Sequence, residues 1–200
     1  MREYDWDGFW DFAARSKLFL RLLYGVHFKQ YRKLLKGIPL SAPRILELGA
    51  GTGVIPQKLL SRFGGSAVLV DNNSKAFSLF QEFRVEGLAV NYIREDVFTL
   101  DMCDEFDLVC SDGLLEHFDD ADREKLIAIH RRAVKPNGFV VLFVPNDTST
   151  MRFLNRRAPD FGREGVFSLS NLEALCRANG LTVIARVSYF FEVGVLCVRM

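Results

Sequence analysis

A glycine-rich turn between an apolar run and a helical segment constrains the fold of this chain more than any other feature. The turn reads Glu47-Leu-Gly-Ala-Gly-Thr-Gly53 and directly follows the apolar run Pro43-Arg-Ile-Leu46. Glycine has no Cβ, so its backbone adopts left-handed angles and a ligand can lie against bare main chain. A helix that opens after such a turn directs unpaired N–H groups and a positive dipole end towards that ligand. The turn therefore predicts a small-molecule site.

The glycine spacing separates this turn from a dinucleotide fingerprint. That fingerprint is G-x-G-x-x-G/A, with an acidic residue about 20 positions further on. Gly49 and Gly51 match it, but Val54 stands where the third glycine or alanine belongs, and Gly53 comes one residue early. A second apolar run ends in Asp71, whose carboxylate can accept hydrogen bonds from both hydroxyls of a ribose.

The order of strand-like and helix-like segments predicts an α/β fold. Alternating strands and helices favour a parallel sheet with helices on both faces. Strand-like runs cover residues 44–48, 67–70, 89–93, 107–110, 139–144, 182–188 and 193–198. Helical spacing predicts helices over 55–63, 75–86 and 123–134, and a capping-box pattern at Ser170 opens a helix that ends at Asn179-Gly180. The last two strands are joined too closely for a crossover helix, so we expect them to pair antiparallel.

These segments resemble the class I S-adenosylmethionine-dependent methyltransferases, from about Arg44 to the C-terminus. The resemblance implies a doubly wound, Rossmann-like sheet of seven strands in the order 3-2-1-4-5-7-6, with the last strand antiparallel. Residues 47–53 resemble the first motif of the family, and residues 134–146 resemble its Lys-Pro-Gly-Gly turn and fifth strand. Asn137 replaces the first of the two glycines, which that turn tolerates.

The resemblance also implies the ligand and its contacts. S-adenosylmethionine is the expected cofactor, with its ribose on Asp71, its adenine amino group on Asp96 and the backbone of Val97 beside the ring. The full set of expected cofactor-binding residues is Glu47, Gly49, Ala50, Gly51, Gly53, Asp71, Asn72, Asp96, Val97, Ser111 and Asp112. No metal is expected.

Three functional interpretations follow. The preferred one is methyl transfer from S-adenosylmethionine to a small molecule. A nicotinamide-dependent oxidoreductase is disfavoured by Val54, the early Gly53 and Asp96. A non-catalytic cofactor-binding module or partner subunit is the third.

A catalytic base is needed only if the acceptor still carries its proton. His117 is the first candidate because it follows the fourth predicted strand, and the competing interpretation is a helix-end histidine bonded to backbone. Weaker candidates are Asp112, Glu116, His27, Tyr4, Tyr24 and Tyr31.

Composition narrows the partners. The net charge of +1 argues against a nucleic-acid partner. The four cysteines lack CxxC spacing, so neither zinc nor a redox motif is indicated, and Cys110 and Cys197 fall in apolar strand patterns. No signal-peptide pattern is visible, and a cytoplasmic location is expected.

Residues 95–124 hold twelve Asp or Glu, and the negative electrostatic field of these acids favours a cationic sulfonium. Four of these acids are expected only to open a helix: Asp119, Asp120, Asp122 and Glu124.

Two segments lie outside the common core. Residues 1–40 form an N-terminal segment that we interpret as a helical lid over the substrate, with 41–200 as the cofactor-binding domain. The stretch from Ala13 to Leu46, which includes most of this segment, has eight Lys or Arg and no acid, so contact with a membrane surface is the alternative.

Residues 146–167 resemble the substrate-side insertion of the family. Four arginines there suit an anionic acceptor: Arg152, Arg156, Arg157 and Arg163. Three aromatic residues there could close a pocket or anchor the loop: Phe153, Phe161 and Phe167.

Overall fold

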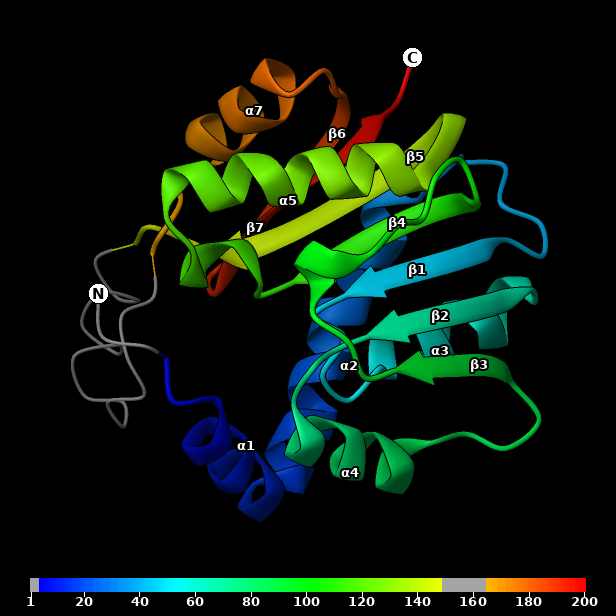
Figure 1. Cartoon of the computed structure of the whole chain (residues 1–200), viewed down its shortest axis with the longest axis vertical. Coiled ribbons are helices and arrows are strands. Elements are labelled where there is room, and N and C mark those ends of the chain that lie inside the picture. Colours follow the sequence, from blue (N-terminus) through cyan, green and yellow to red (C-terminus); the bar gives the residue numbers. More distant parts are fainter. Residues whose placement is uncertain (1–3, 149–164) are drawn as a thin grey trace.

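The computed structural model describes residues 4–148 and 165–200. Seven strands form one sheet in the order β3-β2-β1-β4-β5-β7-β6 (Figure 1). The strands β1 to β5 are parallel, and β7 runs antiparallel to both β5 and β6. The predicted topology, including the reversed last strand, is confirmed. The strands are β1 Arg44–Leu48, β2 Ser66–Val70, β3 Ala89–Ile93, β4 Phe106–Asp112, β5 Val134–Pro145, β6 Thr182–Ser188 and β7 Glu192–Val198.

Helices cover both faces of the sheet. One face carries α5 (Asp120–Ala133) and α7 (Leu169–Ala178), which lie in front of the strands in Figure 1. The other face carries α2 (Lys17–Leu34), α3 (Val54–Phe63) and α4 (Ser74–Phe83), which follows β2 in the chain. Successive residues of each central strand pack into opposite cores. In β5, for example, Val140 and Leu142 face α5, whereas Val141 and Phe143 face α2. This alternation is the period-2 pattern of strands that are buried on both faces.

The N-terminal segment forms two helices rather than one. The helix α1 (Trp6–Arg15) ends at Ser16, and α2 begins at the next residue. Asp5 caps α1 by accepting a hydrogen bond from the N–H of Gly8. Through Trp10 and Ala13, α1 packs against Ala76 and Leu79 of α4.

Several element boundaries differ from those predicted. The helix α4 ends at Phe83, three residues early, because Arg84 is extended and the N–H of Val85 instead donates to the Gln57 side chain. The helix α7 is capped by Ser168, two residues before the predicted capping box, with its hydroxyl accepting from the N–H of Asn171. Asp119 caps α5, as expected of the acids before that helix.

The strand β5 begins five residues before the predicted run. Its first part, from Val134 to Gly138, pairs with β4 through a bulge and includes the predicted turn. There Asn137 adopts a left-handed φ of 62°. Asparagine tolerates this conformation better than most residues, so the departure from glycine is accommodated.

Candidate cofactor and active site

The carboxyl ends of the first four strands open into one cavity of about 1150 Å³. Each of these strands has an acidic residue at its carboxyl end or in the loop that follows, and all four residues line the cavity: Glu47, Asp71, Asp96 and Asp112. This is where the strand order reverses between β1 and β4, the usual ligand site of open α/β sheets. Within the described residues the lining contains six Asp or Glu side chains and no Lys or Arg, so the electrostatic field of the cavity favours a cation.

The glycine turn forms the floor of this cavity. Gly51 has a φ of 51°, and a Cβ added there would lie 2.5 Å from the ring of Trp10. Gly53 begins α3 in the left-handed region, and a Cβ there would lie 2.4 Å from Leu69. Both positions therefore require glycine. At Gly51 the Trp10 side chain of α1 packs against the backbone, and at Gly53 the Leu69 side chain of β2 does so. Gly49, Ala50, Gly51 and the first residues of α3 line the cavity, whereas Gly53 does not.

Asp71 is fixed by two backbone hydrogen bonds. Its oxygens accept from the N–H groups of Gly51 and Asn73, both at 2.9 Å. Burial raises the pKa of the Asp71 carboxyl, and these two donors partly oppose the increase. Each carboxylate oxygen has a second lone pair, so a ligand diol could still donate to a side chain whose orientation is already set. Asn72, next in the chain, also lines the cavity.

Glu47 is buried at the end of β1 with an unsatisfied oxygen. Its Oε2 has no hydrogen-bond partner within residues 4–148 and 165–200. Burial raises the pKa of Glu47 well above its usual range, Asp112 raises it further, and His27 opposes the rise. A cationic donor in the cavity would satisfy this oxygen and restore the charged form. S-adenosylmethionine carries such a group in its ammonium, so the residues present fit that cofactor.

Asp112 is held by a buried network that reaches α2 and β7. The hydroxyl of Tyr31 donates to Oδ1 of Asp112 at 2.7 Å, and Nε2 of His27 lies 3.0 Å from Oδ2. The other ring nitrogen of His27 lies 2.6 Å from Oε2 of Glu192. Burial by itself lowers the pKa of His27, but Asp112 and Glu192 outweigh it and raise the value to about 10. His27 is therefore a buried cation between two carboxylates, not a free base.

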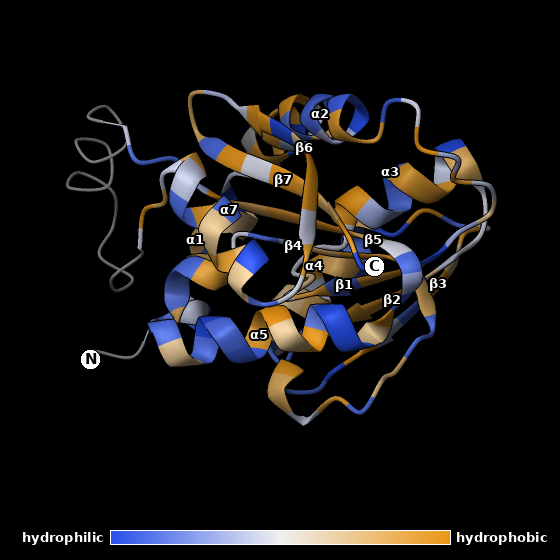
Figure 2. Ribbon diagram, turned by 90° about the horizontal axis from the view of Figure 1, so that it is seen from above, coloured by the Kyte–Doolittle hydropathy of each residue, from blue (hydrophilic) through white to orange (hydrophobic). Residues whose placement is uncertain are grey.

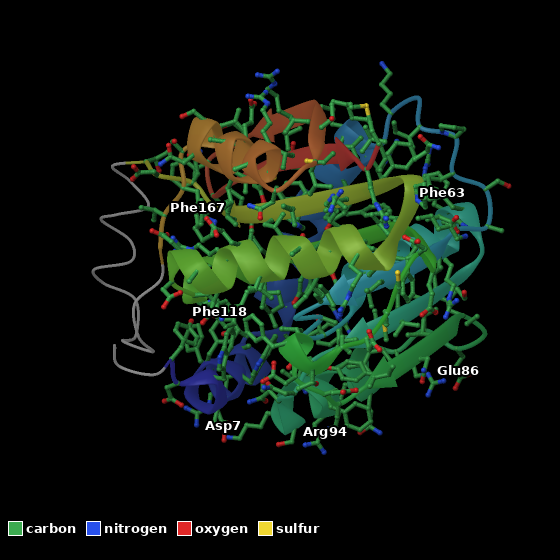
Figure 3. All side chains as sticks on the ribbon, turned by 45° about the horizontal axis from the view of Figure 1, so that its top comes forward. Asp7, Phe63, Glu86, Arg94, Phe118 and Phe167 are labelled. Atoms are coloured by element: carbon green, nitrogen blue, oxygen red, sulfur yellow. The ribbon has the colours of Figure 1, made fainter. Side chains whose placement is uncertain are left out.

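His117 lies in an aromatic wall on the other side of the cavity. The ring centroids of Tyr4 and Trp6 are 4.2 Å and 4.4 Å from its own. Burial lowers the pKa of His117 to about 4, so the imidazole is neutral near pH 7. Phe9 and Phe118 extend the same wall. In Figure 3, Phe118 lies below α5, on the side of α1.

The other sequence candidates are distributed around this site. Val97 and Glu116 line the cavity, as does Tyr24, whose hydroxyl accepts from Thr52 at 2.8 Å. The Ser111 hydroxyl is instead 3.0 Å from Nε2 of His130 in α5 and is absent from the lining. Phe167 is buried against the α5 core and anchors the chain there. The remaining insertion candidates lie outside the described residues: Arg152, Arg156, Arg157, Arg163, Phe153 and Phe161.

Sequence reasoning missed two features. Nothing in the sequence marked Glu192, because its pairing with His27 depends on how the β6–β7 hairpin docks against α2. The aromatic wall did have a signal, since Tyr4, Trp6, Phe9 and Trp10 follow one another at near-helical spacing. Of these residues, only Tyr4 is a sequence candidate, as a base.

Comparison with known proteins supports the same assignment. A family model described as "Methyltransferase domain" matches residues 45–138. The chain is 31% identical over 99 residues to the cyclopropane-fatty-acyl-phospholipid synthase of Escherichia coli K12, an alignment that covers 50% of this chain and 25% of that protein. The match thus spans only a quarter of that relative's length.

Two solved structures share the fold over nearly the whole chain. One is a chain of the complex between the Haloferax volcanii Trm112 methyltransferase activator and a methyltransferase, with a TM-score of 0.78, 15% identity and coverage of 96% and 97%. The other is the Burkholderia thailandensis 1,6-didemethyltoxoflavin-N1-methyltransferase with bound 1,6-didemethyltoxoflavin and S-adenosylhomocysteine, with a TM-score of 0.67, 17% identity and coverage of 94% and 90%.

A methyltransferase-domain model matches residues 45–138, and the strand order and the acid-lined glycine turn are those that the resemblance to the class I S-adenosylmethionine-dependent methyltransferases implies.

Proposed function

We propose that this protein transfers a methyl group from S-adenosylmethionine to a small-molecule acceptor. The observation that carries the proposal is the convergence of Glu47, Asp71, Asp96 and Asp112 on one cavity above the glycine turn. Such a cavity is complementary to a ligand with a cationic amino-acid end, a ribose and an adenine.

We assign the cofactor contacts by position. Glu47 and the backbone of residues 49–51 hold the amino-acid end, Asp71 and Asn72 hold the ribose, and Asp96 and Val97 hold the adenine. Asp112, fixed by Tyr31 and His27, completes the acidic wall. The bound cofactor supplies an activated methyl on a sulfonium, so the protein contributes chiefly the alignment of acceptor and methyl.

The acceptor is proposed to bind against the aromatic wall. Tyr4, Trp6, Phe118 and the neutral imidazole of His117 give this part of the cavity an apolar surface suited to a planar or apolar group. A neutral imidazole can accept a proton, but its pKa of about 4 makes it a weak base. His117 therefore suits an acceptor that is already nucleophilic. An anionic acceptor would depend on the arginines of the insertion.

We further propose that residues 1–40 act as a lid and that 41–200 form the cofactor-binding domain. Four residues from the start of the chain line the cavity, which supports a covering role: Tyr4, Trp6, Phe9 and Trp10. A cytoplasmic location is also proposed, and the four unpaired cysteines support it. Within the described residues, no helix is long and apolar enough to cross a membrane.

The proposal is tested by turnover. Purified protein is incubated with S-adenosylmethionine and a panel of small aromatic and apolar acceptors, and S-adenosylhomocysteine is quantified. We expect release with at least one acceptor, and less release from an Asp71→Ala variant when S-adenosylmethionine is limiting. Saturable S-adenosylmethionine binding without turnover across the panel would instead favour a non-catalytic binding module. Binding of NAD in preference to S-adenosylmethionine would contradict the proposal altogether.

A further inference from the structure

The outer face of α2 carries an apolar stripe that the described part of the chain leaves exposed. Leu18, Leu22 and Val26 are 73%, 65% and 41% exposed. They follow one another at intervals of four residues, so they lie along one side of the helix. The opposite side of α2, through Tyr31 and Leu34, is fully buried against the sheet. The exposed stripe therefore does not serve the core.

Basic residues continue the same stripe. Lys29 and Lys33 lie three and seven positions after Val26, on the same side of the helix, and Arg32 borders them. All three are exposed and form no ion pair with any residue in the described ranges. No acid occurs anywhere in α2. The face is therefore apolar over its first half and cationic over its second, and Figure 2 shows this mixture of orange and blue along α2.

A second exposed apolar group lies beside α2. Phe190 and Phe191, at the tip of the β6–β7 hairpin, are 49% and 37% exposed and pack edge to face. The residue before them, Tyr189, has its hydroxyl 2.8 Å from Nδ1 of His27, so the hairpin tip lies next to the middle of α2. After the hairpin tip, β7 begins opposite Pro145, at the carboxyl end of β5. It therefore lies at the cavity end of the sheet.

We propose that α2 and the β6–β7 hairpin tip dock this protein onto an anionic lipid surface. The apolar residues enter the boundary between headgroups and acyl chains, and the basic residues contact the phosphates, as in amphipathic helices that lie in the membrane plane. Charge complementarity favours this occupant, because an apolar stripe continued by unpaired cations matches a bilayer that is apolar inside and negative outside. The docking does not depend on methyl transfer.

Vesicle co-sedimentation tests the docking surface with the full chain. Vesicles of phosphatidylcholine mixed with phosphatidylglycerol are compared with vesicles of phosphatidylcholine alone. We expect the protein to sediment with the anionic vesicles, and the bound fraction to fall at high salt because screening weakens the contacts of the lysines. Absence of sedimentation with anionic vesicles at low salt would overturn the proposal.

Paired variants assign the binding to the stripe. Leu18→Gln/Leu22→Gln keeps good helix formers and should lower the partition coefficient about tenfold. Its control is Val85→Gln, at an exposed apolar residue outside the stripe, which should leave binding unchanged. Lys29→Gln/Lys33→Gln should lower binding to anionic vesicles by a similar factor of about ten, whereas Lys125→Gln on α5 should not. Thermal unfolding checks that each variant is folded.

Two results would contradict the assignment. One is equal vesicle binding by Leu18→Gln/Leu22→Gln and by its Val85→Gln control. The other is a dimer, measured by light scattering, that Leu18→Gln/Leu22→Gln converts to a monomer, because a second copy of this chain would then cover the stripe.

Discussion

At the scale of single residues, the site depends on carboxylates that the fold holds in different states. Asp71 is oriented by two backbone N–H groups, whereas Glu47 is buried with one oxygen unsatisfied. Asp112 is matched by a buried cation, His27. The resemblance to the methyltransferase family implied that these three acids, each at the end of a predicted strand, bind the cofactor. It could not predict their different environments, which depend on residues far away in the chain.

Asp71→Ala should weaken S-adenosylmethionine binding by about 1–3 kcal/mol, because the ribose loses a charged hydrogen-bond acceptor. Calorimetric titration measures the change. The matched control is Asp101→Ala, since the Asp101 side chain is 96% exposed and lies outside the cavity. An affinity of the Asp71 variant equal to that of the control would remove Asp71 from the cofactor site.

His27 should make the stability of the protein depend on pH. Its pKa is raised from 6.5 to about 10 in the folded state, so the folded protein binds this proton more tightly than the unfolded chain does. The stabilisation is complete below about pH 6.5 and is lost as the pH rises through 10. His27→Gln should therefore reduce the free energy of unfolding most at pH 6, by a few kcal/mol at most, and least near pH 10. Urea unfolding at several pH values measures this difference, and a constant difference would contradict the buried-cation assignment.

At the scale of elements, local patterns predicted the sheet well and the helix ends less well. The strands β1 and β3 begin and end at the predicted residues because apolar runs between turn residues define them. The helix α4 stops early because Gln57 of α3 captures the N–H of Val85, a tertiary contact that no local pattern reveals. Likewise, the sequence of the N-terminal segment, residues 1–40, did not predict that the chain divides at Ser16 into two helices.

The contact between α1 and the glycine turn yields a prediction at this scale. Gly51→Ala places a methyl group against Trp10 at a left-handed φ. It should destabilise the protein by about 1–3 kcal/mol and weaken cofactor binding, because α1 must move off the turn. Gly25→Ala is the control, since a Cβ added there would meet no atom within 4 Å. Within a helix this change should stabilise by about 0.5–1 kcal/mol. Urea unfolding compares the two, and equal stabilities would contradict the close contact.

At the scale of the whole molecule, one part of the proposed site follows from the strand order of the sheet, and the other part does not. The proposed cofactor half is built from strand ends and turns whose order follows from the topology, and most of the cofactor residues predicted from the sequence line the cavity there. The proposed acceptor half is built from residues that are distant in the chain, including Tyr4, Trp6 and His117. The sequence indicated Tyr4 and His117 only as candidate bases. Their meeting depends on the path of α1 over the sheet, for which the sequence contains no local rule.

A crystal structure of the full chain with S-adenosylhomocysteine would test the proposed cofactor site most directly. We expect the ligand in the cavity at the carboxyl ends of β1 to β4, with its ribose hydroxyls on Asp71, its amino group at Glu47 and its adenine beside Asp96 and Val97. Electron density for the ligand at any other place, or a cavity that stays empty at saturating ligand, would contradict the assignment.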